Sequence, residues 1–348
     1  MSIRSDETGC GLVVVITTIQ EPTPAVHTLA ARLRPLSAPL LSIGDKKGPA
    51  TFDLEGARFL DLEAQMATPF DLAKLGPVGH YTRKNIGYLE AMRMGASCLY
   101  ETDDDNAPLA SWAPRELEVE AHAVDAPGWV NVYRCFTEDR IWPRGLPLDE
   151  VVGSMQQAPL KSPTAERVRA PIQQGLANGS PDVDAVWRLV LDRPFDFDDG
   201  PSVVLAQGSW CPFNSQSTWW WPEAFPLLYL PSFCSFRMTD IWRSFVAQRC
   251  LWELGLGLVF HPAEVVQDRN MHNLMRDFND EIPGYQRNRE LVQVLTDTPL
   301  LPGAGAVEDN LQRCYEALVR NDFFSGDELH LLAAWRDGLE TASLGEAR

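Results

Sequence analysis

Short apolar runs alternate with helix-like segments in the first part of the chain. Residues 12–16 form a continuous apolar run of mostly β-branched residues, which is typical of a strand buried on both faces. Residues 40–43 and 57–60 predict two further strands, and residues 25–34 predict a helix between the first two strands. Strands that alternate with helices indicate parallel β–α–β units. The pattern therefore predicts an α/β fold with a central, mostly parallel sheet flanked by helices.

The most informative segment is residues 81–106, YTRKNIGYLEAMRMGASCLYETDDDN. A helix is predicted first, from the apolar residues Ile86, Leu89, Ala91, Met92 and Met94, with Gly95 as a suitable stop. A short apolar run at residues 96–100 then predicts a strand. Three aspartates follow where the chain leaves this strand, and ligands of open α/β sheets bind at the carboxyl ends of strands.

This acidic run has two interpretations, a solvated turn or a metal site. Asp103, Asp104 and Asp105 repel one another unless a cation is present, and Mg²⁺ takes carboxylate oxygens while sharing its other positions with phosphates. Arg83 and Lys84 open the preceding helix, and a helix N-terminus with nearby cations favours phosphate. We therefore expect a site for a divalent metal and a diphosphate, and hence a nucleotide-linked substrate.

The second half of the chain offers fewer signals. Asp182 and Asp184 form another acidic pair, for which a metal site and the start of a helix are both open interpretations. Residues 209–231 are dense in aromatic residues, which either pack in the core or line a sugar-binding cleft. A helix is predicted at residues 239–255, a strand at 256–260, and two amphipathic helices around 311–318 and 328–339. We place a boundary between residues 284 and 285, with a small C-terminal helical appendage after it.

Composition narrows the class of protein. The chain has 348 residues, of which 45% are hydrophobic and 22% charged, with a formal net charge of −18. This charge argues against a nucleic-acid partner, because phosphate backbones require a basic surface. The seven cysteines are scattered and contain no CxxC pair, so buried thiols in a reducing compartment are expected rather than zinc ligands. No apolar run reaches the length of a membrane span, so a cytoplasmic protein without an integral membrane segment is predicted.

Two families share motifs with this sequence. Nucleotide-sugar glycosyltransferases of the GT-A (Rossmann-like) fold often carry an Arg–Asn–Gly helix, a strand ending in a DxD motif, and a later acidic residue that opens a helix. A narrower set of motifs resembles the STELLO family of glycosyltransferases over about residues 12–270: VVVITTIQEPT, GDKK, YTRKNIGYLEAMRMGA, ETDDDN, IWPRGLPLD, CPFNSQST and FRMTDIWRSFVAQRCLWELG. Plant members of that family carry a membrane anchor that is not evident here.

The resemblance implies a role for each matching residue. Residues 1–284 would be the GT-A-like nucleotide-sugar-binding and catalytic domain, which uses Mn²⁺ or Mg²⁺. The implied donor-binding residues are Thr17, Thr18, Asp45, Arg83, Lys84, Asn85, Asp103 and Asp104. The implied metal ligands are Asp103, Asp105 and Asp268, with His272 as an alternative to Asp268. Asp240 matches the catalytic base of inverting relatives, and the implied acceptor-binding residues are Trp142, Arg144 and Arg243.

The expected reaction is transfer of a sugar from a nucleotide sugar, with a UDP-sugar as the favoured donor, to a hydroxyl of a glycan or another acceptor. Two alternatives stay open: a nucleotide-sugar mutase that isomerises the donor without an acceptor, and a non-catalytic protein of the same fold that binds a partner. The C-terminal helices either pack within the chain or form a homodimer.

Overall fold

A central sheet organises the chain in the computed structural model, which describes residues 11–268 and 273–345. Within these residues the sheet has eleven strands, and ten of them follow the order β3-β2-β1-β4-β12-β9-β13-β10-β6-β8. The strands in this order are β3 (Ala57–Leu60), β2 (Leu40–Ile43), β1 (Leu12–Thr17), β4 (Cys98–Thr102), β12 (Ser217–Trp220), β9 (Ile172–Asn178), β13 (Leu258–Gln267), β10 (Val203–Leu205), β6 (Glu118–Val124) and β8 (Lys161–Arg169). The short β5 (Asn106–Pro108) pairs with β13, and β7 (Gly128–Trp129) pairs with β11 (Ser209–Trp210) in a second sheet.

The predicted α/β class is confirmed. β3, β2, β1 and β4 form a parallel block, while β12 runs antiparallel to both β4 and β9. The second half of the sheet is mixed, because β9–β13 and β10–β6 are parallel pairs and β6–β8 and β10–β13 are antiparallel. The helices are α1 (Pro24–Leu33), α2 (Leu62–Met66), α3 (Leu72–Leu75), α4 (Lys84–Arg93), α5 (Leu148–Gln156), α6 (Ala185–Val190), α7 (Thr239–Trp252), α8 (Leu274–Asp297), α9 (Val307–Arg320) and α10 (Asp327–Gly345).

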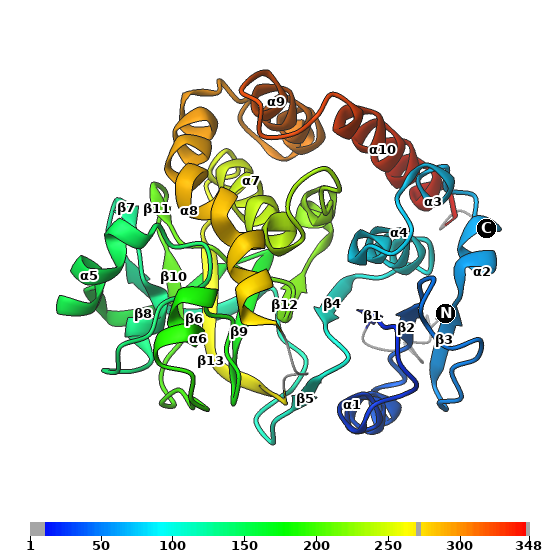
Figure 1. The fold of residues 1–348 in the computed structure, drawn as a ribbon, viewed down its shortest axis with the longest axis horizontal. Helices are drawn as coiled ribbons and strands as arrows, with labels where there is room; N and C mark the ends of the chain where they lie inside the picture. The colour runs from blue at the N-terminus through cyan, green and yellow to red at the C-terminus, as the bar shows by residue number, and fades with distance from the viewer. Residues whose placement is uncertain (1–10, 269–272, 346–348) are drawn as a thin grey trace, which may run out of the picture.

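β1 is buried on both faces, as its apolar run predicts. Val13 and Val15 belong to the hydrophobic cluster on one face of the sheet, and Leu12, Val14 and Ile16 belong to the cluster on the other. Successive side chains of a strand point to opposite faces, so a strand covered on both sides must be apolar throughout. Figure 1 shows the two covering layers, α4 on one side of the sheet and α1 on the other.

α4 lies between the sheet and α10, which explains why its sequence has little amphipathic character (Figure 1). A Cβ atom at Gly87 would lie 2.6 Å from Val15 of β1, so only glycine permits this approach of the helix to the sheet. On the outer side, a Cβ atom at Gly338 of α10 would lie 2.6 Å from Leu89. The helix that leads to the acidic run is therefore fixed on both sides.

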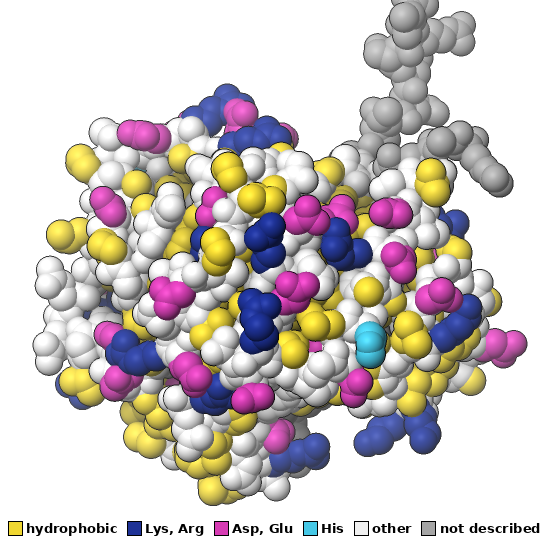
Figure 2. Space-filling view, turned by 90° about the horizontal axis from the view of Figure 1, so that it is seen from above, with side chains coloured by type: hydrophobic (Ala, Val, Ile, Leu, Met, Phe, Trp, Pro, Cys, Tyr) yellow, Lys and Arg dark blue, Asp and Glu magenta, His cyan; other side chains and the backbone are white. Residues whose placement is uncertain are grey.

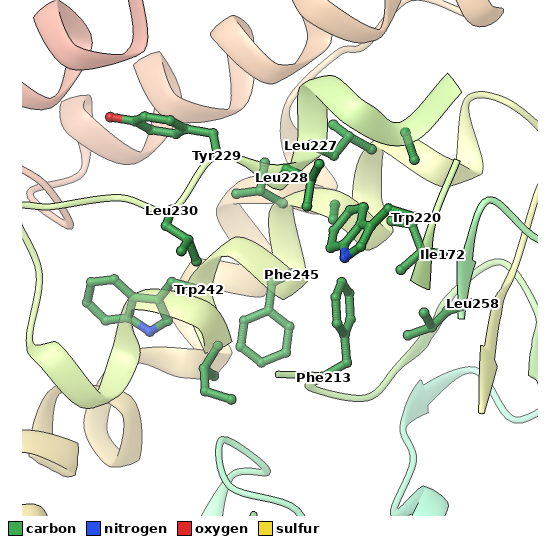
Figure 3. Close-up of a cluster of buried hydrophobic side chains, with 14 of the residues drawn as sticks. Ile172, Phe213, Trp220, Leu227, Leu228, Tyr229, Leu230, Trp242, Phe245 and Leu258 are labelled. Atoms are coloured by element: carbon green, nitrogen blue, oxygen red, sulfur yellow. The ribbon is translucent and has the colours of Figure 1, made fainter. Parts of the chain in front are cut away.

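The aromatic segment at residues 209–231 packs in the core. Trp219 and Trp220 are fully buried, and Figure 3 shows Phe213 and Trp220 beside Phe245 of α7. None of the seven aromatic residues that suggested a sugar cleft, namely Trp210, Phe213, Trp219, Trp220, Trp221, Phe225 and Tyr229, lines the large cavity among the described residues. This core fixes α7 against the sheet.

The C-terminal helices pack within the chain. α9 and α10 match the two predicted amphipathic helices, but α8 runs without a break through the expected boundary at residues 284 and 285. Pro283 lies inside this helix, although proline usually interrupts one. The C-terminal helices therefore start at Leu274, eleven residues before the predicted start at residue 285.

The outer surface above these helices mixes charges of both signs. In Figure 2, which views the molecule from above, basic side chains have acidic neighbours, and single hydrophobic side chains lie between them. Among the residues that the structure describes, no helix is both long enough and apolar enough to cross a membrane.

α10 is tied to the segment that precedes α7 by one buried carboxylate. Glu328 accepts hydrogen bonds from the backbone N–H groups of Ser232 (3.0 Å) and Phe233 (2.7 Å) and from the Tyr229 hydroxyl. Residues 232–235 lead directly into the 3₁₀ turn η5 (Phe236–Met238) and α7. The C-terminal helices therefore position a loop that reaches the large cavity.

We predict that Glu328→Ala destabilises the protein by about 2 kcal/mol, because it leaves two backbone N–H groups without an acceptor. Asp327→Ala is the matched control, since the Asp327 side chain is 72% exposed and precedes Glu328 on the same helix. The measurement is urea unfolding of both variants. Equal stability of the two variants would show that Glu328 does not hold the loop.

Candidate active site

A cavity of about 630 Å³ opens at the carboxyl ends of β1, β2 and β4. Thr17 and Thr18 line it at the end of β1, Asp45 follows β2, and the acidic run Asp103–Asp105 follows β4. The topology thus brings together residues that are far apart in the sequence, because parallel strands end at the same edge of a sheet. This is the place that the sequence predicted for a ligand.

Two carboxylates of the acidic run are fixed by neighbours. The Thr18 hydroxyl donates to Asp104 Oδ2 at 2.6 Å. The buried Lys84 ammonium contacts Asp103 Oδ1 at 3.1 Å and donates to the Thr102 carbonyl at 2.7 Å. Lys84 was expected to bind the donor directly, but it does not line the cavity. Its buried ammonium group instead compensates the negative charge of Asp103 from the protein side.

The third carboxylate, Asp105, has a hydrogen-bond partner at only one of its oxygens among the described residues. Its Oδ2 accepts from Gln267 of β13 at 3.0 Å, whereas its Oδ1 is buried and has no hydrogen-bond partner among the described residues. Burial and the repulsion from Asp103 raise the pKa of Asp105 to about 7. Burial also raises the pKa of Asp103, with Lys84 opposing it. These groups fit a cation, which would compensate their charge.

A cation at this position needs ligands beyond the acidic run. Within residues 11–268 and 273–345, no three His, Cys, Asp or Glu side chains are arranged to hold a metal ion. Asp268 does not complete the set in this structure, because it is exposed and only its backbone N–H contacts Asp105, at the carbonyl oxygen (3.3 Å). His272 lies outside the described residues. The donor set fits an ion shared with phosphate oxygens and water.

The other donor-side residues surround a loop at residues 79–83. Asp45 accepts hydrogen bonds from the backbone N–H groups of Gly79 (2.7 Å) and His80 (2.8 Å), so it holds this loop at the rim of the cavity. Arg83 lines the cavity but is 2% exposed, and it donates to Gln65 Oε1 at 2.8 Å. Within the described residues, Lys47 at the rim makes no ion pair, so this exposed cation can approach an anion.

Three residues expected at the site lie elsewhere. The Asn85 amide pairs with both backbone groups of Leu230 at 2.9 Å and joins α4 to the loop after β12. Trp142 is buried and donates its indole N–H to Asp184 at 2.7 Å. Neither residue lines the cavity, so their expected donor and acceptor contacts are corrected to structural ones.

Arg243 is the third of these residues. It is 1% exposed, pairs with Glu101 of β4 at 2.8 Å, and lies 5.0 Å from the Trp220 ring centre. Arg243 lies three residues after Asp240 on α7, but its side chain packs in the core and does not line the cavity. Its expected acceptor-binding role is corrected to a buried ion pair.

Asp240 lies at the start of α7 and lines the cavity, bound to a buried arginine. Arg144 contacts Asp240 through both terminal nitrogens, at 3.1 and 2.9 Å, and contacts Asp182 on its other side at 2.7 and 2.8 Å. Asn214 also donates to Asp182, at 2.9 Å. Burial acts to raise the pKa of Asp240, but the charge of Arg144 outweighs it and holds this pKa below its ordinary value.

Sequence reasoning missed several residues of the cavity. Asp182 lines it, whereas Asp184 caps the start of α6 by accepting the Trp187 N–H at 2.8 Å, so the helix-start interpretation holds for Asp184 alone. The other lining residues without a predicted role at this site include Lys47, His80, Tyr81, Asn214, Phe236, Arg237 and Gln267. The acidic pair drew attention to Asp182, whereas nothing in the sequence indicated Asn214, since only the folded chain brings Asn214 to Asp182 and Asp182 to Arg144.

Comparison with known proteins identifies relatives of this chain. Residues 237–345 match the family model of STELLO glycosyltransferases. From Arabidopsis thaliana, "Probable glycosyltransferase STELLO2" is 34% identical over 246 residues, which are 65% of this chain and 32% of the relative. "Probable glycosyltransferase STELLO1" is 32% identical over 269 residues, which are 72% of this chain and 34% of the relative. The chain thus spans about a third of the length of these relatives.

These matches confirm the family resemblance seen in the sequence, and the enzyme class in the relatives' names agrees with the predicted class. The mixed sheet with flanking helices is consistent with a GT-A-like fold. The family model covers Asp240 together with the C-terminal helices, which agrees with their packing against α7 and α4.

We predict that Arg243→Leu destabilises the protein by roughly 3–5 kcal/mol, because it leaves the Glu101 carboxylate buried without a counter-charge. Arg34→Ala is the contrasting control, since Arg34 and Glu55 form an exposed ion pair whose loss should cost about 1 kcal/mol or less. Removing both buried charges in Glu101→Gln/Arg243→Met should cost less than Arg243→Leu alone. Unchanged stability with weakened acceptor binding would restore the acceptor role.

We also predict that Asp105→Asn stabilises the protein at pH 8 in the absence of metal and nucleotide. The pKa of Asp105 in the folded protein, about 7, exceeds the ordinary value of 3.8. The free energy of unfolding therefore falls as the pH rises from 3.8 to about 7, because the buried carboxyl group must ionise in the folded protein. The melting temperature at pH 8 should rise by about 2 °C or more. The difference should shrink as the pH falls toward 4, and a variant less stable than the parent at pH 8 would contradict the account.

Proposed function

We propose that this chain is a metal-dependent glycosyltransferase that moves a sugar from a nucleotide sugar, with a UDP-sugar as the favoured donor, to an acceptor hydroxyl with inversion. The observation that carries the proposal is the shared cavity of the acidic run after β4 and of Asp240 at the start of α7. The two acidic groups are close enough for Asp240 to influence the pKa of Asp103. Family similarity supports the same reaction class.

The donor half of the reaction belongs to the strand ends. Asp103 and Asp105 would hold Mn²⁺ or Mg²⁺ together with the diphosphate, and the bound ion would compensate the charge that develops on the departing nucleoside diphosphate. Lys84 keeps Asp103 in place from behind. Thr17, Thr18 and Asp45 lie along the same wall, where a nucleoside would bind.

The acceptor half belongs to Asp240. Inversion requires the acceptor oxygen to bond to the anomeric carbon on one face while the carbon–oxygen bond to the diphosphate breaks on the other. The acceptor proton then passes to Asp240, which is ionised at neutral pH because Arg144 lowers its pKa. Arg144 also binds Asp182 and the Arg237 carbonyl, so it keeps partners when one oxygen of Asp240 turns to the acceptor.

The donor site is tested by calorimetric titration of UDP, GDP, CDP and dTDP in the presence of Mn²⁺. Asp103→Asn and Asp105→Asn should weaken binding of the preferred nucleotide by at least about tenfold, because each removes a charged oxygen ligand. Asp268→Asn is the matched control, since Asp268 is an exposed aspartate outside the cavity. Loss of affinity in the control alone would move the metal site to Asp268.

The base is tested by the release of nucleoside diphosphate when water replaces the acceptor. Asp240→Asn should lower this hydrolysis by about 10² or more, because a carboxamide takes no proton. Its affinity for the nucleoside diphosphate should stay within about twofold of the parent value, since the donor residues lie on the strand ends. Undiminished hydrolysis would remove Asp240 as the base.

A further inference from the structure

Three aromatic rings that contact one another line the cavity. His80 and Tyr81 are stacked with ring centres 6.0 Å apart and an angle of 12° between their planes. Phe236 lies edge-on to both, at 5.4 Å from His80 and 5.1 Å from Tyr81. All three residues line the cavity, and we call them the aromatic wall. The wall joins the start of α4 to the start of α7, two segments that are far apart in the sequence.

The Tyr81 hydroxyl is the polar group of this wall. It is inaccessible to solvent and has no hydrogen-bond partner among the described residues. A buried hydroxyl without a partner is rare in folded proteins, because it has lost its bonds to water without replacement. A ligand oxygen in the cavity would supply the missing partner once a small turn of the Tyr81 ring exposes the hydroxyl to the cavity.

The surroundings of the wall fix its protonation. Burial raises the pKa of Tyr81, and the nearby Asp240 raises it further, so the hydroxyl keeps its proton. Burial lowers the pKa of His80, with Asp45 opposing it, so this ring is neutral at physiological pH. The wall therefore consists of uncharged rings, with the Tyr81 hydroxyl behind them as a donor, which suits a ligand with an apolar face and polar edges.

The aromatic wall lies near both acidic groups of the proposed reaction. Asp103 and Asp240 line the same cavity as Tyr81, and both are close enough to raise its pKa. In the proposed reaction the group between the metal-binding carboxylates and the base is the transferred sugar, because its anomeric carbon reacts with both the diphosphate and the acceptor. Sugar rings have an apolar face that packs on aromatic side chains and hydroxyls that form hydrogen bonds at their edges.

We propose that His80, Tyr81 and Phe236 form the subsite for the transferred sugar, in which the rings pack on its apolar face and the Tyr81 hydroxyl bonds to one of its oxygens. This assignment rests on the proposed function and adds the residues that recognise the sugar as distinct from the nucleotide.

The test compares two ligands of each variant by calorimetry with Mn²⁺. The first is the preferred nucleoside diphosphate among UDP, GDP, CDP and dTDP, and the second is the tightest-binding hexose conjugate of the same nucleotide. Tyr81→Phe removes only the hydroxyl. It should weaken binding of the conjugate by about fivefold, which is typical of one lost hydrogen bond, and leave the affinity for the free diphosphate unchanged.

A second variant guards against a folding defect at Tyr81. Phe236 is 49% exposed, so Phe236→Ala removes a ring of the wall at little cost to the core. This variant should also weaken only the binding of the conjugate, by about fivefold. Phe233→Ala is the matched control, because Phe233 is 43% exposed on the same segment and does not line the cavity.

The outcomes separate this inference from the proposed function. Equal weakening of both ligands by Tyr81→Phe or Phe236→Ala would place the wall at the nucleoside or the diphosphate and overturn the sugar subsite alone. Unchanged affinity for both ligands in both variants would overturn it as well. Failure of the unaltered protein to bind any of the nucleotides would overturn the proposed function, and the subsite with it.

Discussion

A buried ion pair between Glu101 and Arg243 holds the two halves of the cavity together. Glu101 lies on β4 two residues before Asp103, and Arg243 lies on α7 one turn after Asp240. Glu101 also accepts hydrogen bonds from Tyr88 of α4 and Trp220 of β12, so four elements meet at one carboxylate. Because a buried charge cannot separate from its partner without a large penalty, the distance between the acidic run and Asp240 is fixed by the core.

The cavity itself concentrates negative charge that the protein compensates only in part. Lys84 offsets Asp103 and Arg144 offsets Asp240, but one oxygen of Asp105 is buried with no hydrogen-bond partner among the described residues. Burying this negative charge without a partner destabilises the folded state, and binding of a cation would remove that cost. The account therefore links a cost in stability to the function proposed for the acidic run.

The sequence predicted the parallel block and the acidic run well, because local patterns determine both: β1 is an uninterrupted apolar run, and Asp103 follows a strand. It predicted partners across the cavity poorly. Helical spacing shows that Asp240 and Arg243 lie close together on α7 but not which of them lines the cavity. Packing places Asp240 at the cavity and Arg243 in the core. Tyr81 stood within the most informative segment, yet its role depends on contacts with Phe236, about 150 residues away. Tertiary packing, which local patterns do not encode, made these differences.

The central claim is that a metal and a nucleoside diphosphate bind together at the end of β4. The most direct measurement is the melting temperature of the protein with UDP, GDP, CDP or dTDP, each with and without Mn²⁺. Because a ligand at a hundredfold excess over its dissociation constant stabilises by about 2.7 kcal/mol, the shift is measurable. The account predicts a shift that requires one nucleotide and Mn²⁺ together. The absence of a shift with every nucleotide, or a shift that does not depend on the metal, would contradict it.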